Sequence, residues 1–309
     1  MIELDEDTRR LVDGSSHPPY LYAIGPDDAR LALAEMQAPP SARADVLPRV
    51  TSVVTRHGPI RATVLVPAAP DFPPPVVLYA HGGGWLVGGY ETHHRLATAM
   101  CQGAGAVVVV PEYARTPEAR FPVAVEQLTD VLSWIRAGGL PVAADQGQIA
   151  VAGDCAGATM ALAIALGDRG AGQPLAGQIL LYPLGRPGDD DPSVAEFATG
   201  AALRLDDVRR LYRAYSPHDP RADPLAEVDV RGLPPTLLVT AEADVTRDHA
   251  ERFGARLRAA GVPITATRYL GVVHDFAVLD AVRWTPSART VTAQVTAHLR
   301  AGFGPPRAL

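Results

Sequence analysis

The feature that most constrains the fold is an alternation of short apolar runs with amphipathic segments. The runs VVLYA (76–80), VVVVP (107–111) and QIAVAG (148–153) are apolar at nearly every position. Strands that are buried on both faces show this pattern, because helices cover each side of a parallel sheet. The alternation therefore predicts an α/β fold, with a mostly parallel sheet flanked by helices.

The segments between these strands carry helix start and stop signals. Segment 121–139 has a Pro near its start and Gly after its end, and segment 247–261 is amphipathic with a terminal Gly. Residues 1–46 form polar helical pieces broken by prolines, and residues 186–204 form an insertion rich in Pro and Asp. The other predicted strands are 50–56, 60–67, 178–183, 235–241 and 264–270, and the other predicted helices are 158–168, 205–215 and 288–300.

Composition excludes several classes of protein. Hydrophobic residues make up 47% of the 309 residues and the net charge is −6, so neither a disordered chain nor a basic nucleic-acid-binding protein is expected. No apolar run is long enough to span a membrane, and the acidic start does not resemble a signal peptide. Two cysteines do not form a disulfide framework, which predicts a cytoplasmic protein. Every basic residue is Arg, which hints at a bacterial source.

A candidate nucleophile follows the apolar run 148–153. The pentapeptide Gly153-Asp154-Cys155-Ala156-Gly157 leads into an apolar helix, which is the G-x-nucleophile-x-G pattern in a strand–turn–helix context. The reversal needs small residues on either side and places the central side chain at a helix N-terminus. We expect a lowered pKa for a Cys at this position.

A glycine-rich loop follows the run 76–80. Its sequence is His81-Gly82-Gly83-Gly84-Trp85, and consecutive glycines let backbone N–H groups converge on one point, as stabilisation of an oxyanion requires. A phosphate-binding loop is the alternative. The sequence does not support a phosphate-binding loop, because it has no GxxxxGK[ST] pattern and no Lys.

Taken together, the motifs resemble the hormone-sensitive-lipase family of α/β-hydrolases. The resemblance covers most of residues 75–276 and implies an eight-stranded, mainly parallel sheet within one domain, 1–309. It also implies a small helical cap from about residues 1–45 and 186–220. The matching motifs are HGGGW (81–85), EYARTPEARFPVAVEQ (112–127), VAGDCAGA (151–158), LLYP (180–183), DPRADPLA (219–226), LPPTLLVTAEADVTRD (233–248) and GVVHDF (271–276).

The resemblance also implies a catalytic triad of Cys155, His274 and Asp244, with Asp248 as the alternative acid. His274 would take the thiol proton and Asp244 would fix the tautomer. Asp275 stands where Gly is frequent in the family. An exposed loop carboxylate is the simplest expectation for it, and the alternatives are that it tunes His274 or contacts the substrate. The implied oxyanion hole comprises the backbone amides of Gly82, Gly83, Gly84 and Ala156.

The sequence gives less specific indications for the other polar and aromatic residues. His81 is expected to hold the glycine loop by hydrogen bonds. His93, His94 and Cys101 lack the spacing of metal ligands, so neither a metal nor a cofactor is predicted, and Cys101 is expected to be a small core residue. The candidate substrate-binding residues are Trp85, Tyr90, Asp154, Tyr212 and Tyr215, with Tyr212 and Tyr215 equally suited to a cap core.

Cys155 departs from the Ser that is usual in the family and leaves three functions open. The first is covalent acyl chemistry on a small-molecule ester, lactone or thioester, by hydrolysis, acyl transfer or cyclisation, whether the Cys is natural or an engineered replacement of Ser in an ordinary esterase. The second is an elimination with His274 as base. The third is ligand binding without turnover. A homodimer is compatible with the sequence but is not indicated by it.

Overall fold

The computed structural model describes residues 2–40, 45–68, 73–200, 202–227 and 229–304. Its centre is an eight-stranded sheet with the strand order β1-β2-β4-β3-β5-β6-β7-β8. The antiparallel pairs are β1–β2 and β2–β4, and the remaining pairs are parallel. The prediction of a mostly parallel α/β sheet is therefore confirmed. The strands are β1 (Val46–Thr55), β2 (Gly58–Pro67), β3 (Val76–Ala80), β4 (Val107–Pro111), β5 (Ile149–Asp154), β6 (Gly177–Leu181), β7 (Thr236–Ala243) and β8 (Ile264–Val273).

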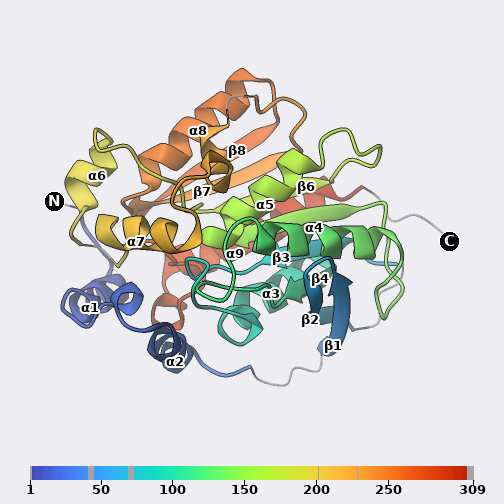
Figure 1. The fold of residues 1–309 in the computed structure, drawn as a ribbon, viewed down its shortest axis with the longest axis horizontal. Coiled ribbons are helices and arrows are strands. Elements are labelled where there is room, and N and C mark those ends of the chain that lie inside the picture. Colours follow the sequence, from blue (N-terminus) through green and yellow to red (C-terminus); the bar gives the residue numbers. More distant parts are fainter. Residues whose placement is uncertain (1, 41–44, 69–72, 201, 228, 305–309) are drawn as a thin grey trace.

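Helices cover both faces of the sheet (Figure 1). Helices α3 and α9 contact each other behind the sheet, whereas α4, α5 and α8 lie in front of it. Every residue of β3, β4 and β5 is buried, which explains their continuous apolar sequences. The helices are α1 (Glu6–Ser15), α2 (Pro26–Met36), α3 (Tyr90–Ala104), α4 (Val123–Arg136), α5 (Ala156–Gly167), α6 (Pro192–Phe197), α7 (Leu205–Tyr215), α8 (Arg247–Ala259) and α9 (Pro286–Gly302), with 3-10 turns η1 (Leu21–Ala23), η2 (Pro220–Ala222), η3 (Pro224–Ala226) and η4 (Asp280–Val282).

The predicted strands and helices are present, with small differences at their ends. Strands 76–80 and 107–111 and helix 205–215 have the predicted bounds. Strand β6 ends at Leu181, two residues earlier than predicted, because Tyr182 has a φ of 34° and turns the chain out of the sheet. The Pro- and Asp-rich insertion 186–204 contains the short helix α6.

The N-terminal segment, defined here as residues 2–40, is attached across the loops that follow the parallel strands. Arg30 forms a bidentate ion pair with Glu118, at 2.7 Å for each contact, and also donates to the carbonyl of Leu86 at 3.1 Å. The Gln37 amide donates to the carbonyls of Thr92 and Val278 at 2.8 and 3.0 Å. These bonds fix α2 beside the carboxyl edge of the sheet, where sites form in open α/β folds.

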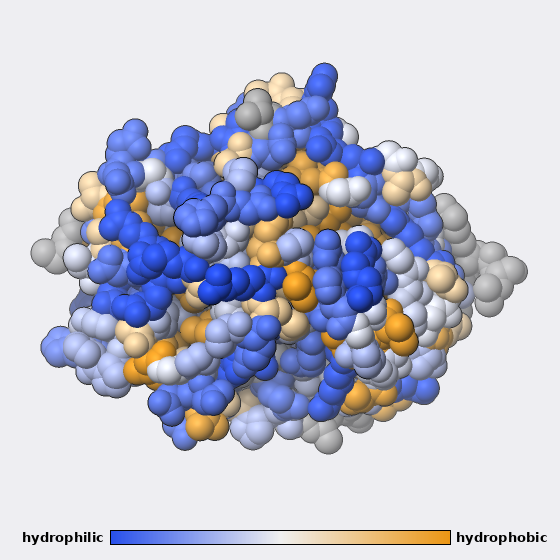
Figure 2. All heavy atoms as spheres, in the orientation of Figure 1, coloured by the Kyte–Doolittle hydropathy of each residue, from blue (hydrophilic) through white to orange (hydrophobic). Residues whose placement is uncertain are grey.

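The face of the molecule seen in Figure 2 is mostly hydrophilic, with apolar residues in scattered patches. Isolated apolar side chains are normal on a protein surface. Among the described helices, none combines the length and apolar character needed to cross a membrane.

Candidate active site

Cys155 occupies the sharp turn between β5 and α5. Its backbone has φ 50° and ψ −124°, a conformation that costs a non-glycine residue energy and persists only where the surroundings impose it. A Cβ at Gly153 would collide with the backbone of Gly157, and a Cβ at Gly157 would collide with the carbonyl of Ala80. The two glycines are therefore required for the turn, as the sequence pattern predicts.

His274 and Asp244 form a buried pair at the ends of β8 and β7. The Nδ1 atom of His274 lies 2.6 Å from Asp244 Oδ2. Asp244 Oδ1 accepts hydrogen bonds from the amide and hydroxyl of Thr246, at 2.8 and 2.9 Å. The alternative acid, Asp248, instead accepts from the Ser193 amide at 2.7 Å. The geometry thus selects Asp244 as the partner of His274.

The charge of Asp244 strengthens His274 as a base. Burial lowers the pKa of His274, but the negative charge of Asp244, with that of Asp275, outweighs this effect and raises the pKa well above its usual value. Because Nδ1 faces Asp244, the other ring nitrogen, Nε2, is available to the other groups of the site, Cys155 and Asp275. Nε2 makes no hydrogen bond to any described residue.

The structure brings Cys155 and His274 together. The Cys155 Sγ, a ring nitrogen of His274 and a carboxylate oxygen of Asp275 all lie within 4.8 Å of one another. Burial raises the pKa of Cys155, and the nearby His274 lowers it only in part. The predicted lowering of this pKa is therefore wrong, because the thiol is fully buried and the cost of desolvating a thiolate exceeds the help from the imidazole.

The glycine loop after β3 places backbone amides beside Cys155. Gly83 and Gly84 have φ values of 101° and 60°, which glycine adopts without strain. Their amides, and that of Ala156 in the first turn of α5, make no described hydrogen bond. The Gly82 amide differs, because it donates to Asp154 Oδ1 at 3.2 Å. Gly83, Gly84 and Ala156 therefore keep their predicted role as candidate donors, whereas the prediction for Gly82 is wrong.

Asp154 fastens the glycine loop. It is fully buried and accepts hydrogen bonds from the Tyr79 hydroxyl and the Gly82 amide. Its Oδ2 lies 3.4 Å from His93 Nε2. Burial raises the pKa of Asp154, but the charge of His93 and these hydrogen bonds outweigh burial and lower it. The structure thus gives Asp154 a place in holding the loop, and its contact with a substrate stays a prediction.

His81 also holds the glycine loop, as predicted. Its Nδ1 lies 2.8 Å from the Gly82 carbonyl oxygen, and its ring stacks on Tyr113. Burial lowers the pKa of His81 to about 3, so the ring is neutral. Cys101 is buried, as predicted for a core residue in a helix. Among the described residues, His93, His94 and Cys101 do not form a group that could hold a metal.

The predicted aromatic contacts lie away from the cavity beside His274. Trp85 is 1% exposed, stacks on Tyr215 with ring centroids 4.1 Å apart, and meets Tyr212 edge to face. Tyr90 packs near His94 on α3. None of these four tyrosine and tryptophan side chains is among the residues that line this cavity, and their role in substrate binding stays a prediction. Their bulk is used to pack the loop and α7 together.

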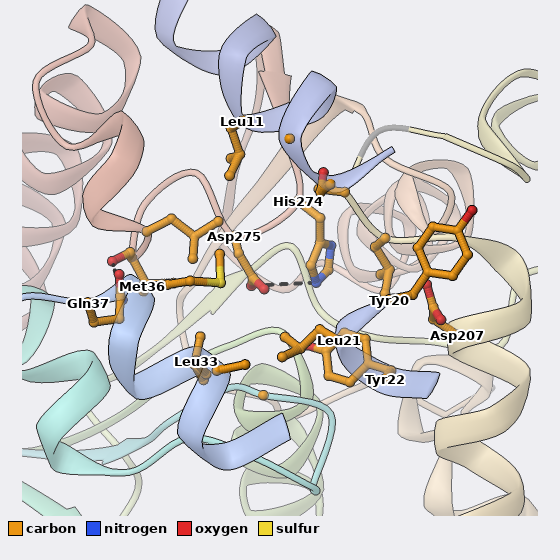
Figure 3. A pocket seen from close by; sticks show the side chains of 18 of the residues that line it. Leu11, Tyr20, Leu21, Tyr22, Leu33, Met36, Gln37, Asp207, His274 and Asp275 are labelled. Carbon is orange, nitrogen blue, oxygen red and sulfur yellow. Dashed lines mark hydrogen bonds and ion pairs between the residues drawn. The ribbon is translucent and has the colours of Figure 1, made fainter. Parts of the chain in front are cut away.

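The cavity is lined mainly by the N-terminal segment (Figure 3). It has a volume of about 490 Å³ and includes His274 and Asp275 in its wall. The sequence analysis did not identify its apolar walls, because these residues lie on short helices without a motif. The segment contributes Leu11, Tyr20, Leu21, Tyr22, Leu33 and Met36.

Asp275 is a further charged group in this wall, where its side chain is 21% exposed, less than an exposed loop carboxylate would be. Its backbone has φ 66°, and its Oδ1 lies 3.6 Å from His274 Nε2 without any described hydrogen bond. Burial raises the pKa of Asp275 to about 6. With Cys155 and His274 it offers sulfur, nitrogen and oxygen donors, the donor types that zinc accepts.

Comparisons with known proteins agree with this architecture. Residues 77–278 match a family described by its alpha/beta hydrolase fold. Esterase LipI of Mycobacterium tuberculosis is 36% identical over 76% of this chain and 75% of its own. Carboxylesterase NlhH of the same species is 31% identical over 91% of each chain. The crystal structure of a thermostable esterase from Pseudomonas putida ECU1011 has a TM-score of 0.92 and 30% identity, covering 98% of each chain. The chain belongs to the α/β-hydrolase family.

Proposed function

We propose that the protein cleaves a small carboxylic ester, lactone or thioester through an acyl-enzyme on Cys155. The observation that carries the proposal is the position of His274. Its Nδ1 is held 2.6 Å from Asp244, its ring lines the cavity, and one of its ring nitrogens lies within 4.8 Å of the Cys155 sulfur. A nucleophile, a base and a group that orients the base form the arrangement that covalent acyl transfer requires.

In the proposed reaction, His274 Nε2 takes the thiol proton as the Cys155 sulfur attacks the substrate carbonyl carbon. The raised pKa of His274 favours the imidazolium that forms in this step. The amides of Gly83, Gly84 and Ala156 donate to the developing oxyanion. The imidazolium then protonates the leaving oxygen, and a thioester remains on Cys155. Attack by water or another acceptor releases the acyl group.

The cavity limits the proposed substrates to small or medium acyl groups. Its volume of about 490 Å³ falls in the range of small-molecule sites. We propose that residues 1–45 and 186–220 act as the cap of a single domain. The N-terminal segment lines the cavity, and α7 contacts η1 within it. Residues 1, 41–44 and 201 lie outside the described residues.

The relatives support an ester as the substrate. LipI is an esterase and NlhH a carboxylesterase, and an ethyl acetate hydrolase of Pseudomonas putida is 28% identical over 85% of this chain. A small ester is consistent with a cavity whose walls are mainly apolar. The relatives' activities are consistent with hydrolysis and do not specify the acyl acceptor of this chain.

Intact-protein mass spectrometry after incubation with p-nitrophenyl esters and acyl thioesters tests the proposal. We expect an acyl adduct on Cys155 that Cys155→Ala lacks, while Cys155→Ser tests whether oxygen can replace sulfur. Turnover that survives Cys155→Ala would contradict covalent catalysis and point to elimination with His274 as base. Ligand binding without turnover of any ester would favour a binding protein.

A further inference from the structure

The Asp275 carboxylate lies in the cavity wall, where the His274 ring is its ion-pair partner. In Figure 3 its side chain points toward His274, and the 3.6 Å contact with Nε2 is its one drawn interaction. Its Oδ1 accepts no hydrogen bond from the described residues. The side chain is 21% exposed, so the carboxylate is largely removed from water, and its Oδ1 gains no such hydrogen bond in return. This is costly, as is a non-glycine residue at φ 66°, and a function for the carboxylate would offset the cost.

The other charged groups around the cavity already have partners. Asp207, on α7, is bonded to Arg204 at 2.6 Å, and Arg10, on α1, pairs with Asp7 at 3.1 Å. His93, on α3, is paired with the buried Asp154. Tyr22, from η1, has a pKa raised well above its usual value by burial and therefore stays neutral. Asp275 is thus the carboxylate in this wall that remains open to a bound molecule.

The number of bases constrains the acyl acceptor. Water or an alcohol must lose one proton to form an acid or ester, and His274 Nε2 can accept that proton. An ammonium group must lose two protons to become an amide nitrogen. The site holds two proton acceptors, a ring nitrogen of His274 and a carboxylate oxygen of Asp275, each within 4.8 Å of the Cys155 sulfur.

We propose that the preferred acyl acceptor is a primary amine, bound as its ammonium ion against Asp275. This inference rests on the proposed acyl-enzyme. A carboxylate attracts an ammonium ion strongly where the surroundings are apolar. Leu21, Leu33 and Met36 supply apolar walls for the amine's hydrocarbon tail, as Figure 3 shows.

The transfer balances without any further reactant. The ammonium gives one proton to Asp275, and the free amine attacks the thioester carbonyl carbon. The second proton passes to His274 Nε2 as the carbon–sulfur bond breaks. The bond's electron pair stays on the Cys155 sulfur, which regains a proton from His274. Asp275 then releases its proton to solvent, leaving an amide and a free thiol.

A competition between butylamine and butan-1-ol for the same acyl-enzyme tests the inference. The ratio of amide to ester products depends only on the step after acylation, so it is insensitive to slower acylation or partial loss of folded protein. We expect Asp275→Asn to lower the amide-to-ester ratio at least tenfold and to leave the ester-to-acid ratio within about twofold, a loss comparable to that of one charge-assisted hydrogen bond. Glu35→Gln, which removes an exposed charge on α2, serves as the matched control and should change neither ratio.

An unchanged amide-to-ester ratio in Asp275→Asn would overturn the inference, as would an equal fall of all acceptors. Asp275→Gly, which suits the positive φ, gives a second variant in case the Asn protein folds poorly. Failure of the underlying function is distinguishable, because the wild-type protein would then show no acyl adduct at Cys155 by mass spectrometry.

Discussion

Two His–Asp pairs lie within this site, and they differ in whether the second ring nitrogen of the histidine already has a partner. In the pair of His274 and Asp244, one ring nitrogen is bonded and the other makes no described hydrogen bond. In the pair of His93 and Asp154, one ring nitrogen of His93 lies 2.8 Å from the Thr92 hydroxyl and the other faces Asp154. Both pairs are buried, so burial alone does not separate them.

The difference teaches that an open position on the imidazole distinguishes the pair proposed to be catalytic. His274 can exchange a proton at Nε2, whereas His93 has both nitrogens engaged. The His93 pair therefore serves as an anchor for the glycine loop through Asp154 and Gly82. The following predictions test this division of roles.

The largest expected effect separates the two histidines by activity. We expect His274→Ala to lower kcat/KM for p-nitrophenyl acetate by about 10³-fold or more, because it removes the base. His93→Ala should lower it by only about 10- to 100-fold, through displacement of the glycine loop. Steady-state assays check both variants, and equal losses would show that the two pairs share one role.

The second effect concerns stability. Asp154→Ala removes the partner of His93 and leaves the Tyr79 hydroxyl and Gly82 amide without an acceptor. We expect a loss of about 3–5 kcal/mol in the free energy of unfolding, measured in urea, as is usual when one member of a buried ion pair is removed.

The pH dependence of that loss has a defined sign. Burial lowers the pKa of His93, but Asp154 outweighs it and raises the pKa; the pKa of Asp154 is lowered. The stability that protonated His93 contributes is lost as the pH rises through its pKa in the folded state. The stability that ionised Asp154 contributes is lost as the pH falls through its pKa in the folded state. The difference between wild type and Asp154→Ala should therefore be largest at mildly acid to neutral pH. A difference independent of pH would contradict an ionised pair.

The smallest effect is a gain of stability. Asp275→Gly removes a buried carboxylate and a non-glycine residue at φ 66°. We expect the folded state to gain about 2 kcal/mol near neutral pH. The pKa of Asp275 is raised from 3.8 to about 6, so its charge penalty is complete above that pH and absent below the unfolded value. Thermal unfolding at acid and neutral pH checks this, and a variant less stable at neutral pH would contradict it.

The sequence predicted those parts of the molecule where backbone geometry restricts residue choice. Close backbone contacts leave no room for a side chain at Gly153 and Gly157. The spacing of these two glycines therefore identified Cys155 as the residue at the turn. The continuous apolar strands located the sheet for the same reason. Asp244 and His274 came from the family resemblance, and their 2.6 Å contact is consistent with that assignment.

The residues that the sequence did not reveal depend on packing between distant segments. Tyr22 and Leu33 line the cavity, but they lie on helical pieces where many apolar residues would satisfy the same periodicity. Trp85 was expected in the pocket, yet it packs on Tyr215 from α7, a contact that no local pattern specifies. The raised pKa of Cys155 likewise depends on burial by the assembled loops.

The attachment of the N-terminal segment has a consequence for how this protein can diversify. Arg30 and Gln37 hold the segment at two places, while the proposed reacting groups all come from the loops of the sheet. The residues that line the cavity and the residues proposed to react therefore lie mainly in separate stretches of the chain. Exchange of the first forty residues between relatives could change which substrates enter the cavity without changing the proposed catalytic residues.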